Sequence, residues 1–173
     1  MNGSKSMVIK LGALWGLVGV LVLLGSAVFR LGPLAIDAFS YEFSWYHWAS
    51  LALIVVVMAY AEGYRGFQQG FSPRVAARAK YLIDHPRGLN MIFAPFFCMG
   101  YFHATKRRKI TSLSLTAGII VLIVLVRLVS QPWRGIIDAG VVLGLVWGIV
   151  SLLVFSVQAF TEEHFPYSPE VRE

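Results

Sequence analysis

The chain has 173 residues, of which 57% are hydrophobic, and it carries a formal net charge of +6. Soluble domains are about 45–50% apolar, so the composition argues against a soluble globular protein. A positive charge can indicate nucleic-acid binding, but Lys and Arg also collect in the cytoplasmic loops of membrane proteins and contact anionic lipid there. We therefore expect membrane lipids as partners and no nucleic acid. The length suits one transmembrane domain over residues 1–173 and leaves no room for a second, soluble domain.

Four long runs contain no Asp, Glu, Lys or Arg, and the connections between them carry the charged residues, with most of the bases between the second and third runs. A run of about 18 or more such residues can cross the hydrocarbon core of a bilayer as a helix. The sequence therefore predicts an all-α polytopic membrane helix bundle with four transmembrane helices. The expected spans cover about 8–30, 43–66, 110–129 and 136–160.

The charge distribution predicts how the chain is threaded. Lys5 and Lys10 precede the first span, and bases are enriched on the cytoplasmic side of membranes. The connection 31–42 carries two acids and no base, and an aromatic belt follows it, as expected on the outer side. The fourth span then returns the tail, 161–173, to the cytoplasm. Both termini are expected to be cytoplasmic, in a membrane that size and charge bias suggest is a bacterial inner membrane.

The uncharged segment 88–105 is nearly long enough to be a further span. Basic clusters flank it on both sides, so a crossing would leave one cluster outside, against the positive-inside rule. Asn90, Pro95 and Gly100 interrupt the segment, and proline kinks a helix. We predict a re-entrant or interfacial segment packed inside the bundle, because broken backbone at membrane depth must be satisfied by protein or water. The alternative is a fifth span, which places the termini on opposite sides.

Residues 73–84 have the pattern of a cationic amphipathic helix. Ser72 is a suitable N-cap and Pro73 suits the first helical position. Apolar residues recur at helical spacing beside Arg74 and Arg78. Helices of this kind lie on membrane surfaces. The pattern predicts a short cytoplasmic helix whose bases contact anionic headgroups.

Two groups of polar residues are candidates for binding a ligand on the cytoplasmic side. Glu62, Arg65 and Gln69 fall on one stripe of an α-helix and could bind a headgroup or a carried ion. The plainer alternative is an ion pair that lets a long helix leave the membrane. His103 precedes four consecutive bases that include Arg107, and together they could contact phosphate or transfer a proton. The alternative is a basic cluster that sets the topology.

Arg127, Arg134 and Asp138 form a polar cluster that the threading places on the outer side. Arg134 and Asp138 are spaced by one helical turn and can pair. An acid at membrane depth is costly and often functional. The cluster is expected either to clamp two helices or to line an outer vestibule. The His and Cys spacings fit no metal site, and we expect no cofactor.

Glycines recur at four-residue intervals in two of the spans. Gly140, Gly144 and Gly148 lie on one face of the last span, and Gly12 and Gly16 lie on one face of the first. Small residues at this spacing let helices approach closely. Such faces can seal the bundle within one chain, which is the favoured interpretation, or join chains in an oligomer.

These patterns predict a small membrane protein that acts by assembly, as an oligomeric pore, a transporter-like protein or a subunit of a membrane complex. The alternatives are an enzyme that acts on lipid headgroups at the cytoplasmic face and a passive scaffold that binds anionic lipid. The chain shows no nucleophile elbow, metal set or paired acids. That absence weighs against an enzyme without excluding one.

Overall fold

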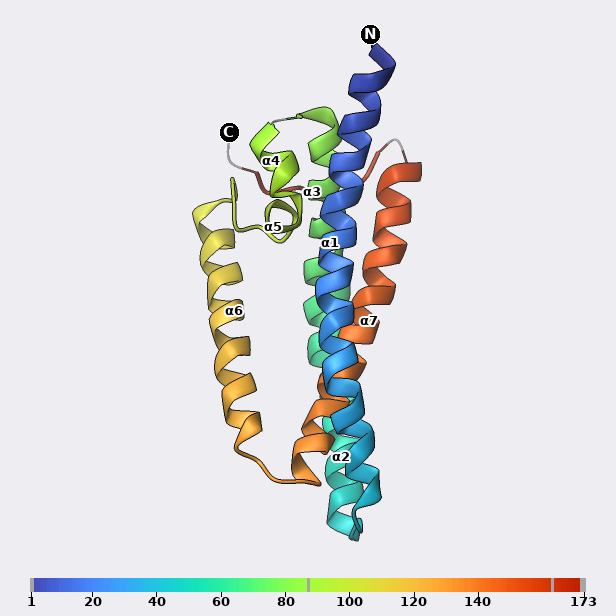
Figure 1. Cartoon of the computed structure of the whole chain (residues 1–173), viewed down its shortest axis with the longest axis vertical. Helices are drawn as coiled ribbons and strands as arrows, with labels where there is room; N and C mark the ends of the chain where they lie inside the picture. The colour runs from blue at the N-terminus through green and yellow to red at the C-terminus, as the bar shows by residue number, and fades with distance from the viewer. Residues whose placement is uncertain (1, 87, 163, 172–173) are drawn as a thin grey trace.

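The computed structural model describes residues 2–86, 88–162 and 164–171, and helices dominate this part of the chain (Figure 1). Four helical stretches are long and apolar enough to cross a membrane, which confirms the helical bundle and supports an integral membrane protein. These stretches are Ile9–Ser40, Trp45–Asp84, Lys109–Arg127 and Trp133–Thr161. The elements in chain order are α1 (Asn2–Asp37), η1 (Ala38–Ser40), α2 (Trp45–Met58), η2 (Ala59–Phe71), α3 (Ser72–Asp84), α4 (Gly88–Ile92), α5 (Ala94–Cys98), α6 (Lys106–Arg127) and α7 (Trp133–Thr161).

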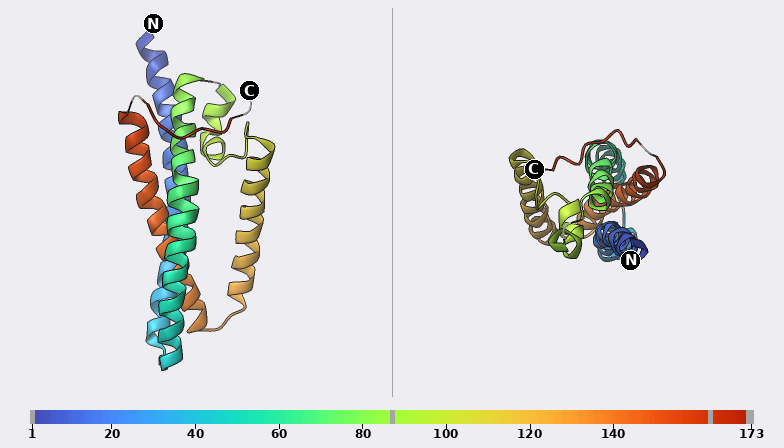
Figure 2. Two further views of the ribbon diagram at one scale, coloured as in Figure 1. Left: turned by 180° about the vertical axis from the view of Figure 1, so that it is seen from behind. Right: turned by 90° about the horizontal axis from the view of Figure 1, so that it is seen from above.

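The N-terminal start of α1, the short helices α4 and α5, and the C-terminal tail all lie at one end of the bundle (Figure 1). The connections 41–44 and 128–132 lie at the opposite end. Seen from above, α1, α3 and α7 cluster together, and α6 lies to one side of them (Figure 2). An even number of long helices returns the chain to the end from which it started, so both termini share one end.

The second long helix does not end near residue 66, as the sequence suggested. It runs without a break for 40 residues through α2, η2 and α3. Its middle part, η2, is a π-helix of 13 residues, and the α-helical spacing resumes at Ser72. Ser72 has helical φ and ψ angles and is not an N-cap. Pro73 stands in the first turn of the renewed α spacing, where proline is tolerated, so it does not end the helix.

Helix α3 is therefore not a separate helix lying on a membrane surface. Its apolar stripe, which includes Val75, Ala76, Ala79 and Leu82, is almost completely buried against α1, α5 and α7. The periodicity correctly identified the apolar face of α3. The surface expected to contact that face was wrong. The face packs against other helices rather than a membrane surface, because α3 continues a span and lies among the other helices of the bundle (Figure 2).

Residues 88–105 contain two helices, α4 and α5, of five residues each. Five residues rise about 7.5 Å, so neither helix can cross a bilayer, and the described part of the chain contains four span-length helices rather than five. Glycines on one face of α1 bring this segment close. A Cβ atom added to Gly16 would lie 2.9 Å from Cys98 Sγ, and one added to Gly19 would lie 2.4 Å from Pro95 Cγ.

The glycines of α7 form a seam with α2 and η2. A Cβ atom on Gly140 would lie 2.5 Å from Ile54 Cγ2, and one on Gly148 would lie 2.5 Å from Phe67 Cδ1. At Gly144 the nearest atom is Glu62 Cβ, at 3.0 Å. These glycines therefore seal the bundle within one chain, which was the favoured of the two interpretations.

Candidate functional site

Helix α6 stands apart from the other long helices over most of its length (Figures 1 and 2). Large apolar side chains are exposed all around it, among them Leu115 (59% exposed), Ile120 (57%) and Val121 (57%). These three side chains point in different directions around an α-helix. A helix that is apolar on every side is the pattern of a span that contacts lipid or another protein rather than a helix half buried in its own bundle.

A few contacts near its two ends hold α6 in place. Ser112 Oγ donates a hydrogen bond of 3.2 Å to the Met99 carbonyl. The Tyr101 and Thr116 hydroxyls form a second hydrogen bond. Near the other end, Val126 is buried. Between these points the apolar side chains of α6 have no substantial packing against the bundle among the described residues.

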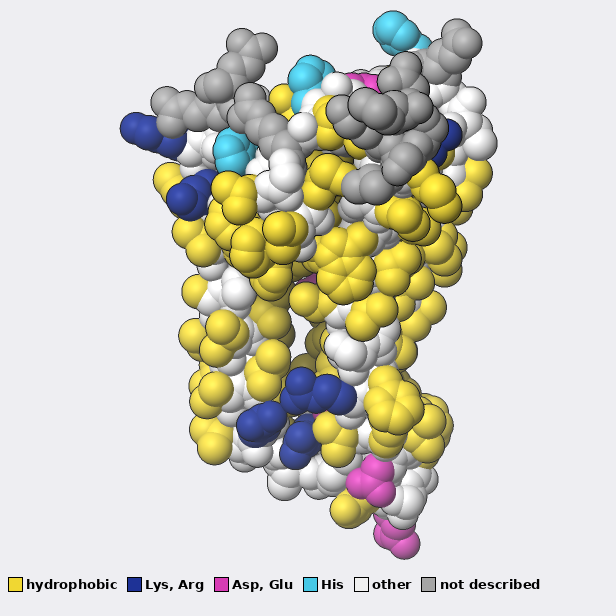
Figure 3. Space-filling view, turned by 45° about the horizontal axis from the view of Figure 1, so that its top comes forward, with side chains coloured by type: hydrophobic (Ala, Val, Ile, Leu, Met, Phe, Trp, Pro, Cys, Tyr) yellow, Lys and Arg dark blue, Asp and Glu magenta, His cyan; other side chains and the backbone are white. Residues whose placement is uncertain are grey.

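The space between α6 and the rest of the bundle is open, and the background shows through it in the space-filling view (Figure 3). This gap lies between α5 and the connection 128–132 (Figure 1). Because Ser112 and Thr116 face the bundle, helical periodicity places Ile119 and Ile123 on the same stripe, facing the gap. The α6 wall of the gap is therefore apolar.

The opposite wall includes α1. The face of α1 that seats α5 through Gly12, Gly16 and Gly19 continues beyond α5 toward the far end of the bundle. Leu23 lies on that face by periodicity, and Arg30 follows Gly12 by about five helical turns. Both side chains are exposed. The α1 wall is thus apolar near α5 and ends in a base.

Lys and Arg side chains gather at the foot of the gap, the end farthest from α5 (Figure 3). The bases near this end are Arg30 on α1, Arg127 at the end of α6 and Arg134 at the start of α7. Arg30 and Arg127 are exposed. Sequence analysis identified Arg127 and Arg134 but overlooked Arg30. Helical spacing could have identified it, because Arg30 lies on the same face of α1 as Gly12, Gly16 and Gly19.

Asp138 is the buried acid near this foot, with 3% of its surface exposed. Arg134 Nε lies 3.7 Å from Asp138 Oδ2, and neither atom has a hydrogen-bond partner among the described residues. The two side chains therefore lie side by side in one helix, at the spacing noted in the sequence. Among the described residues, Arg134 is the base that pairs with this buried carboxylate.

Gln131 fixes the start of α7 to the end of α1. Its Nε2 atom donates to the Leu34 carbonyl at 3.1 Å and to Asp37 Oδ2 at 3.3 Å. Its Oε1 atom accepts a hydrogen bond of 2.9 Å from the Gly135 backbone N–H. Sequence analysis did not identify Gln131, because both Leu34 and Asp37, its partners, lie more than 90 residues earlier in the chain. The anchor fixes where Arg134 lies relative to α1.

The structure does not bring Glu62, Arg65 and Gln69 together. Arg65 and Gln69 are exposed, whereas Glu62 is partly buried and packs against Gly144. Within the described chain, Glu62 and Arg65 form no ion pair. The cause is the π-helix: its backbone bonds run from residue i to i+5, so the alignment expected from α-helical spacing is lost.

Arg78 and Arg74 hold the C-terminal tail instead of facing outward together. Arg78 is 2% exposed, and its guanidinium donates to the Phe102 carbonyl at 2.7 Å and to the Pro169 carbonyl at 3.3 Å. It also lies 4.5 Å from the centre of the Phe97 ring. Arg74 Nη1 lies 3.8 Å from a carboxylate oxygen of Glu170. These bases therefore stabilise the tail, and Arg78 faces the protein interior rather than lipid headgroups.

His103 is exposed, at a positive φ of 49°. It lines a shallow pocket of about 390 Å³ together with Lys106 and Lys109. Arg107 is exposed but does not line this pocket. The pocket is basic and open, and no carboxylate or second histidine lines it. It can attract an anion but lacks the acid and base pair of a hydrolytic site.

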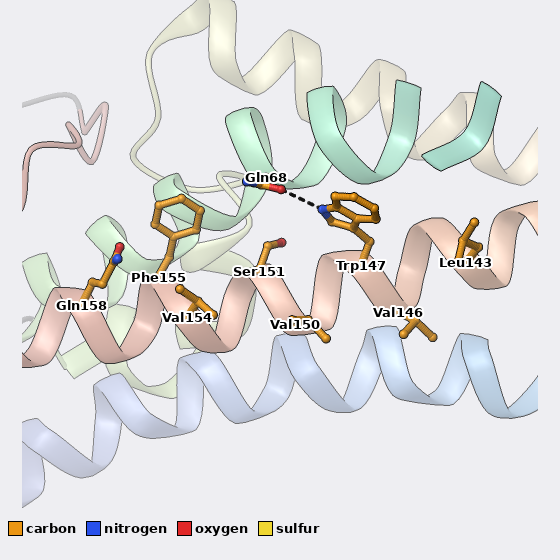
Figure 4. A pocket seen from close by; sticks show the side chains of 9 residues that line it. All are labelled: Gln68, Leu143, Val146, Trp147, Val150, Ser151, Val154, Phe155 and Gln158. Atoms are coloured by element: carbon orange, nitrogen blue, oxygen red, sulfur yellow. Dashed lines mark hydrogen bonds between the residues drawn. The ribbon is translucent and has the colours of Figure 1, made fainter. Parts of the chain in front are cut away.

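A second, apolar groove of about 560 Å³ follows one face of α7 (Figure 4). At its rim, Trp147 Nε1 donates a hydrogen bond of 2.8 Å to Gln68 Oε1, which joins α7 to η2. Val146, Val150 and Val154 continue the groove along α7. The side chains drawn offer apolar surface and a few amide and hydroxyl groups, with no charge.

Cys98 is 2% exposed in the core near α1. Burial raises the pKa of its thiol from 9.0 to about 12, and the nearby Arg78 charge opposes that rise only in part. The thiol therefore stays protonated at neutral pH and is a poor nucleophile. Among the described residues, no three His, Cys, Asp or Glu side chains are placed to hold a metal ion.

Comparison with known proteins assigns no function: no family model, curated protein or solved structure matches the chain. Function has to be inferred from geometry. Helix α6 and the gap beside it are the features that packing within the bundle does not explain. They are the candidate functional region.

Proposed function

We propose that the protein acts by assembly in a membrane, and that the outward face of α6 contacts a second copy of the chain. The gap-facing stripe contains Ser112 and Thr116. Ser114 and Gly118 lie on a different face, turned away from the bundle. Their spacing is that of a small-xxx-small helix contact. This face is free to meet another helix.

Gly118 carries the proposal. A glycine in the interior of a helix costs about 1 kcal/mol relative to alanine. The glycines of α7 have a packing reason, because a Cβ atom there would collide with α2 or η2. A Cβ atom on Gly118 would meet nothing within 4 Å. Gly25 is equally open, but its neighbours four residues away are Leu21 and Phe29, whereas Gly118 has Ser114 four residues before it. The small-residue face at Gly118 therefore favours a contact outside the single chain.

The same proposal covers location and orientation. The end that holds both termini also carries Lys106, Arg107 and Lys109, and bases are enriched on the cytoplasmic side. We therefore propose that this end is cytoplasmic, in a bacterial inner membrane, and that the segment 88–105 lies at or near that interface. The opposite end, with its aromatic side chains, is then the outer end.

An enzyme acting on headgroups is less well supported. It would use Glu62, Arg65, His85 and His103 beside a surface helix. Glu62 packs against α7, whereas His103 lines a pocket of its own near the start of α6. Helix α3, the expected surface helix, is buried. The proposed assembly does not require these four residues to lie close together.

Native mass spectrometry of the protein in lipid nanodiscs tests the assembly. The variant is Gly118→Leu, and its matched control is Gly25→Leu, since a Cβ atom on Gly25 also meets nothing within 4 Å. We expect the wild-type protein and the control to form one defined oligomer, and Gly118→Leu to lower its population at least about tenfold. A monomeric wild-type protein, or an unchanged Gly118→Leu oligomer, would contradict the proposal.

A further inference from the structure

The gap on the inward side of α6 has the shape and the polarity of a lipid site. Its α6 wall is apolar through Ile119 and Ile123, and its α1 wall is apolar through Leu23. Lys and Arg side chains gather at one end of it (Figure 3). A cavity that is apolar along its length and basic at one end matches the chemistry of a phospholipid, which has apolar chains and one phosphate.

The length of the gap fits one leaflet of a bilayer. The open part of α6 runs from Thr116, which is bonded to Tyr101, to Arg127. At 1.5 Å per residue this stretch is about 16 Å long. Half of a hydrocarbon core of about 30 Å is about 15 Å. A lipid whose phosphate lies at Arg127 would therefore end its acyl chains close to α5.

Two of the three bases at the foot of the gap form no ion pair among the described residues. Arg134 lies beside Asp138, but its Nε atom makes no hydrogen bond within the described chain. Arg30 and Arg127 form no ion pair among the described residues. Guanidinium groups bind phosphate well, because their N–H donors are arranged as a fork that matches two oxygens. Arg30 and Arg127 have no ion-pair partner among the described residues, and such bases beside an apolar gap call for an anionic ligand.

We propose that the gap between α6 and α1 holds one membrane phospholipid, with its phosphate on Arg30, Arg127 and Arg134 and its acyl chains between the two helices. An anionic phospholipid is held more tightly than a zwitterionic one, since it leaves a net negative charge beside these bases. The site uses the inward face of α6. It is therefore independent of the proposed assembly, which uses the outward face.

Lipid retention tests the headgroup end of the site. The protein is reconstituted in nanodiscs of equal parts phosphatidylglycerol and phosphatidylcholine, released into the gas phase, and weighed with its bound lipid. The variant is Arg30→Gln with Arg127→Gln, because both side chains are exposed and their removal leaves no partner unpaired. The control is Arg65→Gln with Lys109→Gln, which removes two exposed bases elsewhere.

We expect wild-type protein and control to retain one phospholipid per chain, chiefly phosphatidylglycerol, and the variant to retain at least about fivefold less. Equal retention by variant and wild type would overturn the proposal, as would a wild-type chain that retains none. A delipidated protein that binds inorganic phosphate but does not rebind phosphatidylglycerol would overturn it too, because the ligand would then be a free anion.

A second pair of variants tests the apolar part without changing charge. Ile119→Trp enlarges a side chain that faces the gap, whereas Val121→Trp makes the same addition on the opposite side of α6. We expect Ile119→Trp to lower lipid retention at least about fivefold and Val121→Trp to leave it unchanged. An equal effect of the two substitutions would place the retained lipid outside the gap. A wild-type protein that retains the phospholipid but forms no oligomer would support this site and contradict the proposed assembly.

Discussion

Helices α6 and α7 follow each other in the chain and are both long and apolar enough to span a membrane, yet they pack in opposite ways. The glycine face of α7 is buried against α2 and η2, and α7 also packs against α1 and α3. Helix α6 touches the bundle near its ends and is otherwise exposed. Lipid tails are as apolar as leucine, so apolarity alone does not drive helices together in a bilayer.

The difference between the two helices lies in what their small residues do. In α7, Gly140 and Gly148 allow backbones to approach, and Ser151 forms a buried 2.8 Å hydrogen bond with Ser72. In α6, Ser112 and Thr116 bond the segment before the helix, while a Cβ atom added to Gly118 would meet none of the described residues within 4 Å. Close packing in a membrane protein is therefore found where small and polar residues coincide on one face. Three predictions examine this contrast.

The largest effect is expected in the reactivity of a thiol at a buried position and at an exposed position of the same end of the molecule. Burial raises the pKa of Cys98 from 9.0 to about 12, so its thiolate fraction at pH 8 is lower by about a thousandfold than that of an ordinary thiol. Lys106 is exposed at the start of α6. We expect Lys106→Cys, in a Cys98→Ser background, to react with maleimide at pH 8 at least about a thousandfold faster than native Cys98. Alkylation kinetics in detergent measure the ratio.

The same shift has a consequence for stability. Because the folded pKa is raised, the unfolded thiol loses its proton first as the pH rises. The contribution of Cys98 is fully present below pH 9 and declines as the pH rises from about 9 to about 12. Cys98→Ser should reduce this alkaline loss. Reaction of native Cys98 at the rate of Lys106→Cys would show that the core around α5 is open.

The second prediction concerns the α7 seam. Gly140→Leu places a Cβ atom 2.5 Å from Ile54 Cγ2 and 2.9 Å from Met58 Cγ, and both neighbours belong to α2, which packs against α7. Overpacking of this kind costs about 1–3 kcal/mol, occasionally more, and we expect about 3 kcal/mol. Thermal unfolding in detergent measures the loss. Leu122→Phe is the control, since it enlarges an exposed side chain of α6 and should change the stability little.

Much of this contrast was accessible from the sequence. Charge-free runs predicted four span-length helices, and the spacing of Gly140, Gly144 and Gly148 predicted a seam within the chain. Both follow from local rules of hydropathy and close approach. The isolation of α6 was not predictable, because lipid and protein neighbours require the same apolar side chains. Hydropathy therefore identifies a span without identifying its neighbour.

The errors have two causes: at Arg78 a distant part of the chain decides the environment, and at the other positions the backbone departs from α-helical spacing. Arg78 was expected to face headgroups, but its partners are the Phe102 and Pro169 carbonyls, and Pro169 belongs to a tail that follows it by four elements. Glu62 and Arg65 were aligned on the assumption of α-helical spacing, which the π-helix η2 does not obey. Pro73 suggested the start of a new helix. In the structure it follows the change from π-helical to α-helical spacing at Ser72, within one continuous helix. Neither the partners of Arg78 nor the π-helical spacing can be predicted from the neighbouring sequence.

The smallest effect is expected from alanine in place of the two kinds of glycine. Alanine favours a helix by about 1 kcal/mol over glycine. Gly118→Ala gains this preference without a collision, so we expect the isolated monomer to become more stable by about 1 kcal/mol. Gly148→Ala gains the same preference but brings its Cβ atom to 2.5 Å from Phe67 Cδ1, so we expect a net loss of about 1 kcal/mol.

Changes in stability of opposite sign for Gly118→Ala and Gly148→Ala would show that the contrast between α6 and α7 comes from packing rather than from composition. The measurement is thermal unfolding in detergent at a concentration at which the protein is monomeric, because a contact between copies would hide the gain at Gly118. Destabilisation by Gly118→Ala under those conditions would mean that α6 packs against its own bundle more closely than the structure shows. The gap, the phospholipid within it and the assembly face would then all have to be abandoned together, since each requires α6 to stand apart.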